Sequence, residues 1–327
     1  MFYIPLIMNT LSKRLYTSAK SALPKAGKTS WWLLKIIVPI SLIVSFLQYW
    51  GIIAQIAIVL SPAFSLIGLP GESAVVFITS IFLPLYGPVA IISTLPMDMR
   101  EITILALMCL ISHNMFVETA IQKKTGSSFG IMFFLRLGTS ITGAFILNLI
   151  LPDQIGSVHA IQKSIEFHST TDMLQNWIVG AGYLSLKISL IITGLMILQS
   201  ILKEFNILIM ISNIFAPFMR VMGLSKDSSF LWFVAQTLGL TYGSAVMIDE
   251  VENKTISLEN ANLLNYHIAI NHSLLEDTLI FVAIGVPAGW IIGSRFVLAT
   301  LVVWTVRGIM LWNNEKKKKH VIPLLDK

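Results

Sequence analysis

The sequence predicts an all-α polytopic membrane protein made of two inverted repeats, each with about three transmembrane helices and a re-entrant hairpin. Three observations support this prediction. Of the 327 residues, 55% are hydrophobic and only 12% are charged, whereas charged residues make up about a quarter of an ordinary soluble domain. Several apolar runs reach the roughly 20 residues that a helix needs to cross a bilayer. A histidine motif with nearby polar residues also occurs twice at one fixed spacing.

The composition and the motifs exclude several classes of protein. The net charge of +6 comes from basic residues in the tails and short loops, so nucleic acid is not an expected partner. Cys109 is the only cysteine, which excludes a disulfide framework and a thiolate metal site. The sequence contains no nucleophile elbow, P-loop or zinc-protease helix, so we expect neither an enzyme nor a bound cofactor.

The chain divides into two membrane repeats that are joined by a polar linker and flanked by basic tails. The predicted parts are a basic cytoplasmic tail at 1–30, repeat 1 at 31–151, the linker at 152–176, repeat 2 at 177–312 and a basic cytoplasmic tail at 313–327. Because clusters of lysine and arginine mark cytoplasmic ends, we expect a multi-pass protein of the cell (inner) membrane with both termini in the cytoplasm. Residues 8–23 have two interpretations, a short interfacial amphipathic helix or a disordered tail.

Six apolar runs are long enough to be full transmembrane helices. They lie at 31–50, 101–121, 129–151, 177–202, 262–285 and 288–312. Two other apolar stretches, 51–67 and 205–222, contain Pro62 and Pro217, and we expect them to lie partly in the membrane interface.

Two further apolar segments, 73–95 and 229–248, contain residues that interrupt helices. The interruptions are Pro84, Gly87 and Pro88 in the first segment and Gly239 and Gly243 in the second. If both segments crossed the bilayer fully, Lys123 and Lys124 would face the outside, against the positive-inside rule. As re-entrant hairpins they make these lysines cytoplasmic and leave three plus three full spans, which form an inverted repeat. Eight full spans with a parallel repeat remain the alternative.

Chemically matched residues recur at fixed spacings in the two halves. His113 and His272, Glu118 and Asp277, and Arg136 and Arg295 are each separated by 159 positions. Pro62 and Pro217, Gly68 and Gly223, Glu72 and Asp227, and Ser73 and Ser228 are each separated by 155. Such matches argue for an internal duplication, and ionisable residues inside membrane segments usually serve function. We therefore expect one site near the bilayer midplane, lined by both halves.

The polar residues around the histidines predict faces that line a solute pathway. On a continuous helix Asn114 and Glu118 share a face, because they are four residues apart. Ser273 and Asp277 share a face for the same reason. His113 and His272 each lie one position earlier, about 100° around the helix. The five-residue spacing from each histidine to its acid turns the two side chains apart, so we expect no structural metal, and a transported divalent ion remains open.

The two arginines have a structural explanation. Glu118 and Arg136 lie symmetrically about a predicted turn between antiparallel helices, and so do Asp277 and Arg295. Each pair is expected to neutralise its charges in the apolar interior. Direct contact of the arginines with a substrate is the alternative.

The interrupted segments supply further candidate binding residues. Gly71-Glu72-Ser73 and Asp227-Ser228 precede helix starts, where unpaired N–H groups attract polar or anionic ligands. Capping of those helix starts is the alternative role for the two acids. Tyr242-Gly243-Ser244 lies deeper in the second segment, where a glycine allows the backbone to approach a ligand or simply forms a tight turn.

Four stretches carry a resemblance to a known family. They are LIGLPGESAVVFITS, LISHNMFVETAIQKKTGSSFG, QTLGLTYGSAVMIDE and INHSLLEDTLIFVAIG. The chain resembles the nucleoside recognition, or Gate, domain family, which is shared with spore maturation membrane proteins and the gate regions of ferrous iron permeases. It is distantly similar to concentrative nucleoside transporters. That resemblance implies re-entrant hairpins, inverted repeats and contact of Gly71-Glu72-Ser73 with a nucleoside base.

The expected function is therefore that of an integral membrane transporter or permease for a small polar solute. Nucleosides or related metabolites are the substrates that the resemblance implies. The expected partners are a small-molecule or ion substrate and the lipid bilayer, and homo-oligomerisation remains open. Two alternatives also remain open: a non-transporting membrane protein of envelope or spore-type maturation, and a divalent metal ion permease.

Overall fold

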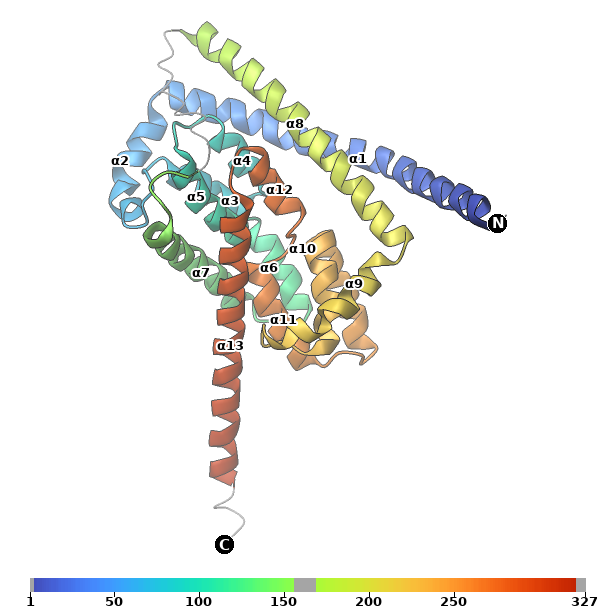
Figure 1. The fold of residues 1–327 in the computed structure, drawn as a ribbon. Coiled ribbons are helices and arrows are strands. Elements are labelled where there is room, and N and C mark those ends of the chain that lie inside the picture. The colour runs from blue at the N-terminus through green and yellow to red at the C-terminus, as the bar shows by residue number, and fades with distance from the viewer. Residues whose placement is uncertain (1–2, 156–168, 322–327) are drawn as a thin grey trace.

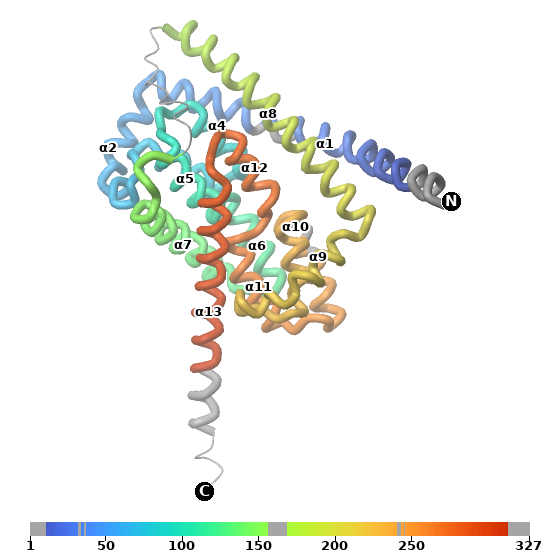
Figure 2. Tube along the Cα trace, in the orientation of Figure 1, coloured from blue at the N-terminus to red at the C-terminus, as the bar shows by residue number. Residues whose placement is uncertain are grey.

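The computed structural model describes residues 3–155 and 169–321, and every regular element in these ranges is helical (Figures 1 and 2). The first half contains α1 (Tyr3–Tyr49), α2 (Ile52–Ser65), α3 (Ser73–Phe82), α4 (Tyr86–Ile92), α5 (Met99–Ser112), α6 (Met115–Lys124) and α7 (Phe129–Ile150). The second half contains α8 (Thr170–Glu204), α9 (Ile207–Phe215), the 3₁₀ turns Ala216–Arg220 and Lys226–Ser228, α10 (Ser229–Glu252), α11 (Leu258–Ile270), α12 (Glu276–Ala283) and α13 (Ala288–Val321). An all-helical membrane architecture is confirmed.

Among the described residues, four helical segments are long and apolar enough to cross a bilayer. They are Met99–Lys124, Phe129–Ile150, Thr170–Glu204 and Ala288–Trp312. A fifth candidate is the pair Ile37–Tyr49 and Ile52–Ser65, which is bent by 84°. These segments agree with the expected spans at 101–121, 129–151, 177–202 and 288–312. Two expected spans contain a break: 101–121 is divided into α5 and α6, and 262–285 is divided into α11 and α12.

The N-terminal tail and the first expected span form one helix. Helix α1 runs for 47 residues and contains Pro24 and Pro39. The helix therefore continues without a break across the expected boundary at residue 30. Residues 8–23 are helical as part of the same helix. The expected linker at 152–176 lies largely outside the described residues, and α8 already begins at Thr170.

Helices α1 and α8 pack side by side with opposite directions (Figure 1). Three contacts along them show the direction. Arg14 pairs with Glu204 at 2.9 Å, the hydroxyls of Ser18 and Ser200 lie 2.9 Å apart, and the Trp177 indole N–H donates to Ser41 Oγ at 3.0 Å. The partner's number falls as the residue number in α1 rises, so the two helices are antiparallel.

The unusual backbone turns recur in the two halves. Positive φ angles occur at Gly51 (71°) and Asn206 (52°), Gly68 (71°) and Gly223 (74°), Asn114 (46°) and Ser273 (49°), and Gly126 (99°) and Gly285 (105°). The first two pairs are separated by 155 positions and the last two by 159, as the sequence matches are. Because residues other than glycine rarely adopt positive φ, the recurrence shows that both halves use the same turns.

Each half contains a helical hairpin. The first hairpin is α3 and α4, which are joined by residues 83–85 and pack together. The second hairpin is α10, which reverses direction at Gly239, where φ is 83° and ψ is 169°. A Cβ atom on Gly243 would lie 3.0 Å from Cα of Ala235, although eight residues of straight helix span about 12 Å. The two arms of α10 therefore fold back on each other, as expected for the 229–248 segment.

The inner helices are buried on every side, whereas the outer helices expose apolar side chains to the surroundings. Ten successive residues of α5, 103–112, are buried, as are residues 263–270 of α11. Large apolar side chains are exposed on α7 and α13, including Phe134, Leu149 and Leu301. A helix that is apolar all round belongs in the interior, and the outer apolar surface matches a lipid environment. This arrangement places α5 and α11 at the centre of the protein.

Gly71 provides a test of the packing between α2 and the first hairpin. A Cβ atom at this position would lie 2.1 Å from the backbone carbonyl oxygen of Ala57. We expect Gly71→Ala to destabilise the protein by about 1–3 kcal/mol, because backbone atoms cannot move aside as a flexible side chain does. The measurement is the thermal unfolding temperature of purified protein in detergent. Gly138→Ala is the matched control, since a Cβ atom there meets nothing within 4 Å. Equal unfolding temperatures for the two variants would refute the close packing.

Candidate functional site

The hairpins of both halves dock onto breaks in the central helices. Helix α5 ends at Ser112 and α6 begins at Met115, and the Asn114 N–H between them donates to the carbonyls of Ser80 (2.8 Å) and Leu83 (3.0 Å) in the first hairpin. In the second half the Ser273 N–H donates to the Ala235 carbonyl at 3.0 Å. The Asn114–Ser80 bond and the Ser273–Ala235 bond join equivalent positions of the two halves. The expected helical face shared by Asn114 and Glu118 is wrong, because Asn114 has left-handed backbone at the break.

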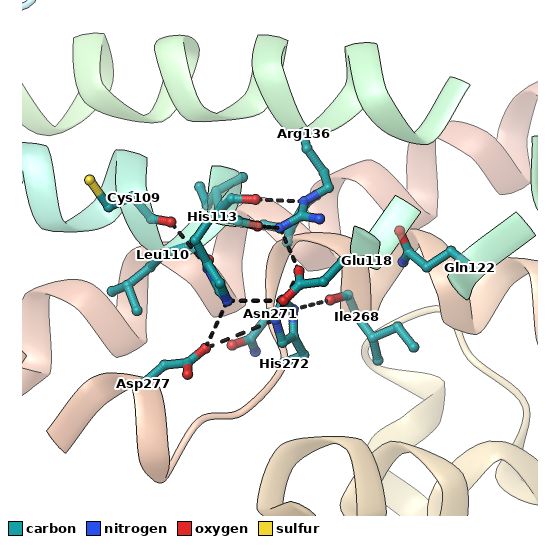
Figure 3. Close-up of polar contacts among 12 residues, drawn as sticks. Cys109, Leu110, His113, Glu118, Gln122, Arg136, Ile268, Asn271, His272 and Asp277 are labelled. Atoms are coloured by element: carbon teal, nitrogen blue, oxygen red, sulfur yellow. Dashed lines mark hydrogen bonds and ion pairs between the residues drawn. The ribbon is translucent and has the colours of Figure 1, made fainter. Parts of the chain in front are cut away.

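The two breaks turn four ionisable side chains toward one another (Figure 3). We call His113, Glu118, His272 and Asp277 the central cluster. The Nε2 atom of His113 lies 3.1 Å from Glu118 Oε1 and 3.7 Å from Asp277 Oδ2; Nε2 of His272 lies 3.4 Å from Glu118 Oε2 and 3.9 Å from Asp277 Oδ2. The expectation that a five-residue spacing separates each histidine from its acid is therefore wrong. The expectation assumed one continuous helix from His113 to Glu118, but His113 has extended backbone and a new helix begins after it.

The outer ring nitrogen of each histidine contacts the carbonyls of its own helix. Nδ1 of His113 lies 3.2 Å from the carbonyl oxygens of Cys109 and Leu110, and Nδ1 of His272 lies 2.7 Å from that of Ile268. A carbonyl oxygen only accepts hydrogen bonds, so Nδ1 carries the proton in each ring. When a ring is neutral, its Nε2 atom presents a lone pair to the central cluster.

The central cluster is buried, and some of its polar atoms have no hydrogen-bond partner. His272 is 1% exposed, His113 5%, and the two acids 7% each. Among the described contacts, His272 Nε2 and Asp277 Oδ2 make no hydrogen bond. Buried polar atoms are almost always bonded in folded proteins. These two atoms are therefore available to a polar ligand, a proton or a cation.

Arg136 and Arg295 stabilise the broken helix ends. Arg136 donates to the carbonyls of Ile111 (2.7 Å) and His113 (2.8 Å), and its guanidinium pairs with Glu118 at 2.7 Å. Arg295 donates to the carbonyls of Ile270 (3.2 Å) and His272. The last carbonyls of a helix lack partners within the helix, and a cation also complements the negative end of its dipole. Neither arginine is exposed.

The expected ion pairs of the arginines have different outcomes. The pair of Glu118 and Arg136 is confirmed. The pair of Asp277 and Arg295 is wrong, since the ionisable side chains within 4.0 Å of Asp277 in the described part of the chain are the two histidines. Aspartate is shorter than glutamate by one methylene, while Arg295 is engaged by the helix carbonyls.

The predicted binding residues at the start of the first hairpin lie away from the central cluster. Ser80, near the other end of α3, contacts the break, so the start of α3 is about 10 Å further along the helix. There Gly71 packs against α2, Glu72 makes no capping hydrogen bond, and the Ser73 hydroxyl contacts the Met97 sulfur at 4.0 Å. The structure therefore does not bring Gly71, Glu72 and Ser73 to the site.

The predicted residues of the second half are also divided. Asp227 is exposed and accepts a hydrogen bond from Ser225 (3.1 Å), beside a polar surface cavity of about 660 Å³. Ser228 is buried in the adjacent 3₁₀ turn. Gly243 and the unpaired hydroxyl of Ser244 are buried in the returning arm of the second hairpin. The Tyr242 side chain lies outside the described residues.

Sequence reasoning missed several polar residues near the site. The Tyr86 hydroxyl donates to Glu276 at 2.9 Å and joins the first hairpin to α12. Gln236 in the second hairpin donates to the Asn271 carbonyl, and both side-chain polar atoms of Asn271 are buried without partners. Their positions in the sequence could have identified two of them, because Tyr86 directly follows the break of the first hairpin and Glu276 directly precedes the repeated acid Asp277.

Both halves contribute to the site. His113 faces Asp277 and His272 faces Glu118 across the boundary between them. Close to these contacts, the Gln122 amide donates to the Asn265 carbonyl at 3.1 Å, and the Asn265 amide donates to Thr125 and Ser127. The site therefore exists only where the halves meet, as the repeated motif predicted.

These features define an α-helical integral membrane protein with a polar centre buried between two halves that share the same turns. The model of the nucleoside recognition (Gate) family matches residues 30–131, which include His113 and Glu118. The chain is 31% identical over 284 residues to the uncharacterized membrane protein YvoD of Bacillus subtilis (strain 168), covering 85% of this chain and 90% of that protein. The protein belongs to this Gate family of membrane proteins. No solved structure matches the chain.

The different partners of the two arginines lead to a stability prediction. We expect Arg136→Met to lower the free energy of unfolding by about 3–5 kcal/mol, because it leaves the buried Glu118 carboxylate without its partner. We expect Arg295→Met to cost about 1–3 kcal/mol, because it leaves only carbonyls unpaired. Thermal or denaturant unfolding in detergent measures both.

Second substitutions make this comparison specific. Adding Glu118→Gln to Arg136→Met is expected to recover part of the lost stability, and adding Asp277→Asn to Arg295→Met is expected to recover little. Equal losses for the two arginines, or recovery by Asp277→Asn, would contradict the asymmetry.

Proposed function

We propose that the protein is a transporter or permease for a small polar solute and that the central cluster lines its pathway. The observation that carries the proposal is the meeting of four ionisable side chains, two helix breaks and two hairpins in one buried place. Ionisable groups are costly inside a membrane and are retained there mainly along substrate and ion pathways. A purely structural centre could be built from apolar side chains at lower cost.

The discontinuous helices support a role in transport. In secondary transporters, substrates bind near the bilayer midplane, where interrupted helices present free backbone groups. Here the break in α5–α6 and the break in α11–α12 both border the central cluster. A bound solute would therefore contact parts of the backbone that already depart from regular helix.

An inverted arrangement of the halves in the membrane is part of the proposal. The shared turns and the antiparallel packing of α1 against α8 support it. In such an arrangement one half rocks against the other around a fixed site and exposes it to each side in turn. Basic residues at both ends of the chain favour a cytoplasmic location for both termini in the cell (inner) membrane.

Nucleosides or related metabolites are the proposed substrate class. The description of the family as nucleoside recognition supports this choice. The chemistry of the central cluster is compatible with it, since carboxylates accept from sugar hydroxyls and base N–H groups, and imidazole rings donate or accept.

Uptake measurements test the transport proposal. We expect Glu118→Gln and His272→Gln to lower the uptake of labelled nucleosides into proteoliposomes by at least about tenfold, because each removes a binding group worth more than 1.4 kcal/mol. Asp227→Asn is the matched control, because Asp227 is exposed and lies away from the cluster. Unchanged uptake in both cluster variants, together with an altered cell envelope, would favour the non-transporting alternative.

Cysteine labelling tests the inverted arrangement. Lys123 and Asp153 are both exposed, and the buried Cys109 can be replaced by alanine. In whole cells we expect a membrane-impermeant maleimide to label Asp153→Cys and to reach Lys123→Cys only after permeabilisation. The reverse result would refute the inverted arrangement and favour eight full spans.

A further inference from the structure

We propose that the central cluster binds one divalent transition-metal cation, with His113 Nε2, His272 Nε2 and Asp277 Oδ2 as ligands. His113, His272 and Asp277 each offer one ligand atom within 4.8 Å of the others, and all three residues are buried. The proposal concerns binding and goes beyond solute transport, because a cation can be cargo, a coupling ion or a resident ion at the same place.

The distances between the ligand atoms fit tetrahedral coordination. Bonds of about 2.0–2.2 Å place neighbouring ligand atoms of a tetrahedral site about 3.3–3.5 Å apart. Asp277 Oδ2 lies 3.7 Å from Nε2 of His113 and 3.9 Å from Nε2 of His272. Contraction by a few tenths of an ångström brings these two histidine–aspartate distances into range, and the three ligand atoms lie within 4.8 Å of one another. Glu118 presents Oε1 at 3.1 Å to His113 Nε2 and Oε2 at 3.4 Å to His272 Nε2, so it borders the three ligands without being one of them.

The histidines are held in the tautomer that binds metals. Each Nδ1–H is directed to backbone carbonyls of its own helix, at 3.2 Å for His113 and 2.7 Å for His272. Metal-binding histidines almost always donate their other ring N–H in this way, which fixes the ring and raises the basicity of the ligand nitrogen. In the neutral rings, Nε2 of each histidine faces carboxylate oxygens with a lone pair.

Facing lone pairs repel each other unless a positive species stands between them. Among the described contacts, Asp277 Oδ2 and His272 Nε2 have no donor that would relieve this repulsion. In the part of the chain that the structure describes, no arginine lies within 4.0 Å of Asp277, whereas the charge of Glu118 is balanced by Arg136 at 2.7 Å. A cation at the three ligand atoms would satisfy the lone pairs and the carboxylate charge together.

The ligand set selects a class of cation. Imidazole nitrogens suit Zn²⁺, Fe²⁺, Co²⁺ and Ni²⁺, while Ca²⁺ and Mg²⁺ prefer oxygen ligands only. Two imidazoles and one or two carboxylates therefore indicate a transition metal. The expectation from sequence that no structural metal is bound there rests on a helical spacing that the break between α5 and α6 abolishes.

Spectroscopic titration of the full chain tests the site. The protein is purified in detergent with an affinity tag that contains no histidine, treated with a chelator and titrated with Co²⁺, whose visible absorption reports four-coordinate binding. We expect one Co²⁺ per chain and its displacement by Zn²⁺. Each of His113→Gln, His272→Gln and Asp277→Asn is expected to weaken binding by at least about 100-fold, because loss of a ligand exceeds the 10–100-fold effect of losing an outer partner.

Two controls separate this site from adventitious binding. His267→Gln removes another buried histidine, which accepts from Trp232 at 3.2 Å outside the cluster, and Asp227→Asn removes an exposed acid. Both are expected to keep full Co²⁺ affinity. Thermal unfolding without metal checks that each variant is folded.

Asp277→Asn is the decisive variant, because it changes one atom and breaks no hydrogen bond at Oδ2. Absence of saturable Co²⁺ binding, or equal affinity in wild type and Asp277→Asn, would overturn the proposal. Metal binding without nucleoside uptake would leave this inference standing and refute only the transport proposal, so the two fail separately.

Discussion

The structure depends on how two helices are interrupted inside an apolar body. Where α5 and α11 end, their last carbonyls have no helical partner, and an unsatisfied carbonyl in a membrane interior costs several kcal/mol. Arg136 and Arg295 supply the missing donors from α7 and α13. Once the carbonyls are satisfied, the chain can leave the helix for a few residues and begin a new one. That freedom turns each histidine and its acid toward the same point and gives each hairpin a backbone N–H on which to dock.

In both halves an arginine binds the carbonyls at the end of a broken helix, but the ion pairs of the two acids differ. In the first half Arg136 binds both the helix carbonyls and Glu118, so one guanidinium serves the backbone and the carboxylate. In the second half Arg295 serves the carbonyls alone, and the shorter Asp277 side chain remains near the histidines. The centre is therefore asymmetric although its framework is repeated. The carboxylate oxygen that has neither a hydrogen bond nor an arginine partner, Asp277 Oδ2, and the imidazole nitrogen without a hydrogen bond, His272 Nε2, both belong to the second half of the described chain.

The sequence predicts the framework better than it predicts the site. Composition and apolar run length predict the long helices, and the spacings of 155 and 159 predict turns that recur from Gly68 to Gly223 and from Asn114 to Ser273. The breaks after Ser112 and Ile270 escape prediction, because no glycine or proline marks them and local propensity favours continuing the apolar helix. Glu72 and Asp227 were assigned to the site because they start the hairpins, whereas the contacts are made near the turns of the hairpins, at Ser80 and Ala235. Polar residues at a helix start identify where a hairpin begins, but they do not show how far its turn extends into the protein.

In each half, a backbone N–H directly after the histidine connects the hairpin to the central cluster. The Asn114 N–H that binds Ser80 follows His113 directly, and the Ser273 N–H that binds Ala235 follows His272. A hairpin that moves must therefore either break this bond or move the backbone beside a histidine, and the packed interior resists gradual deformation. Whatever ligand holds the two imidazoles together in the cluster consequently favours the docked position of both hairpins. By the reciprocity of coupled equilibria, docking of the hairpins favours that ligand to the same extent. The repeat thus gives one buried centre two equivalent connections, one to each hairpin.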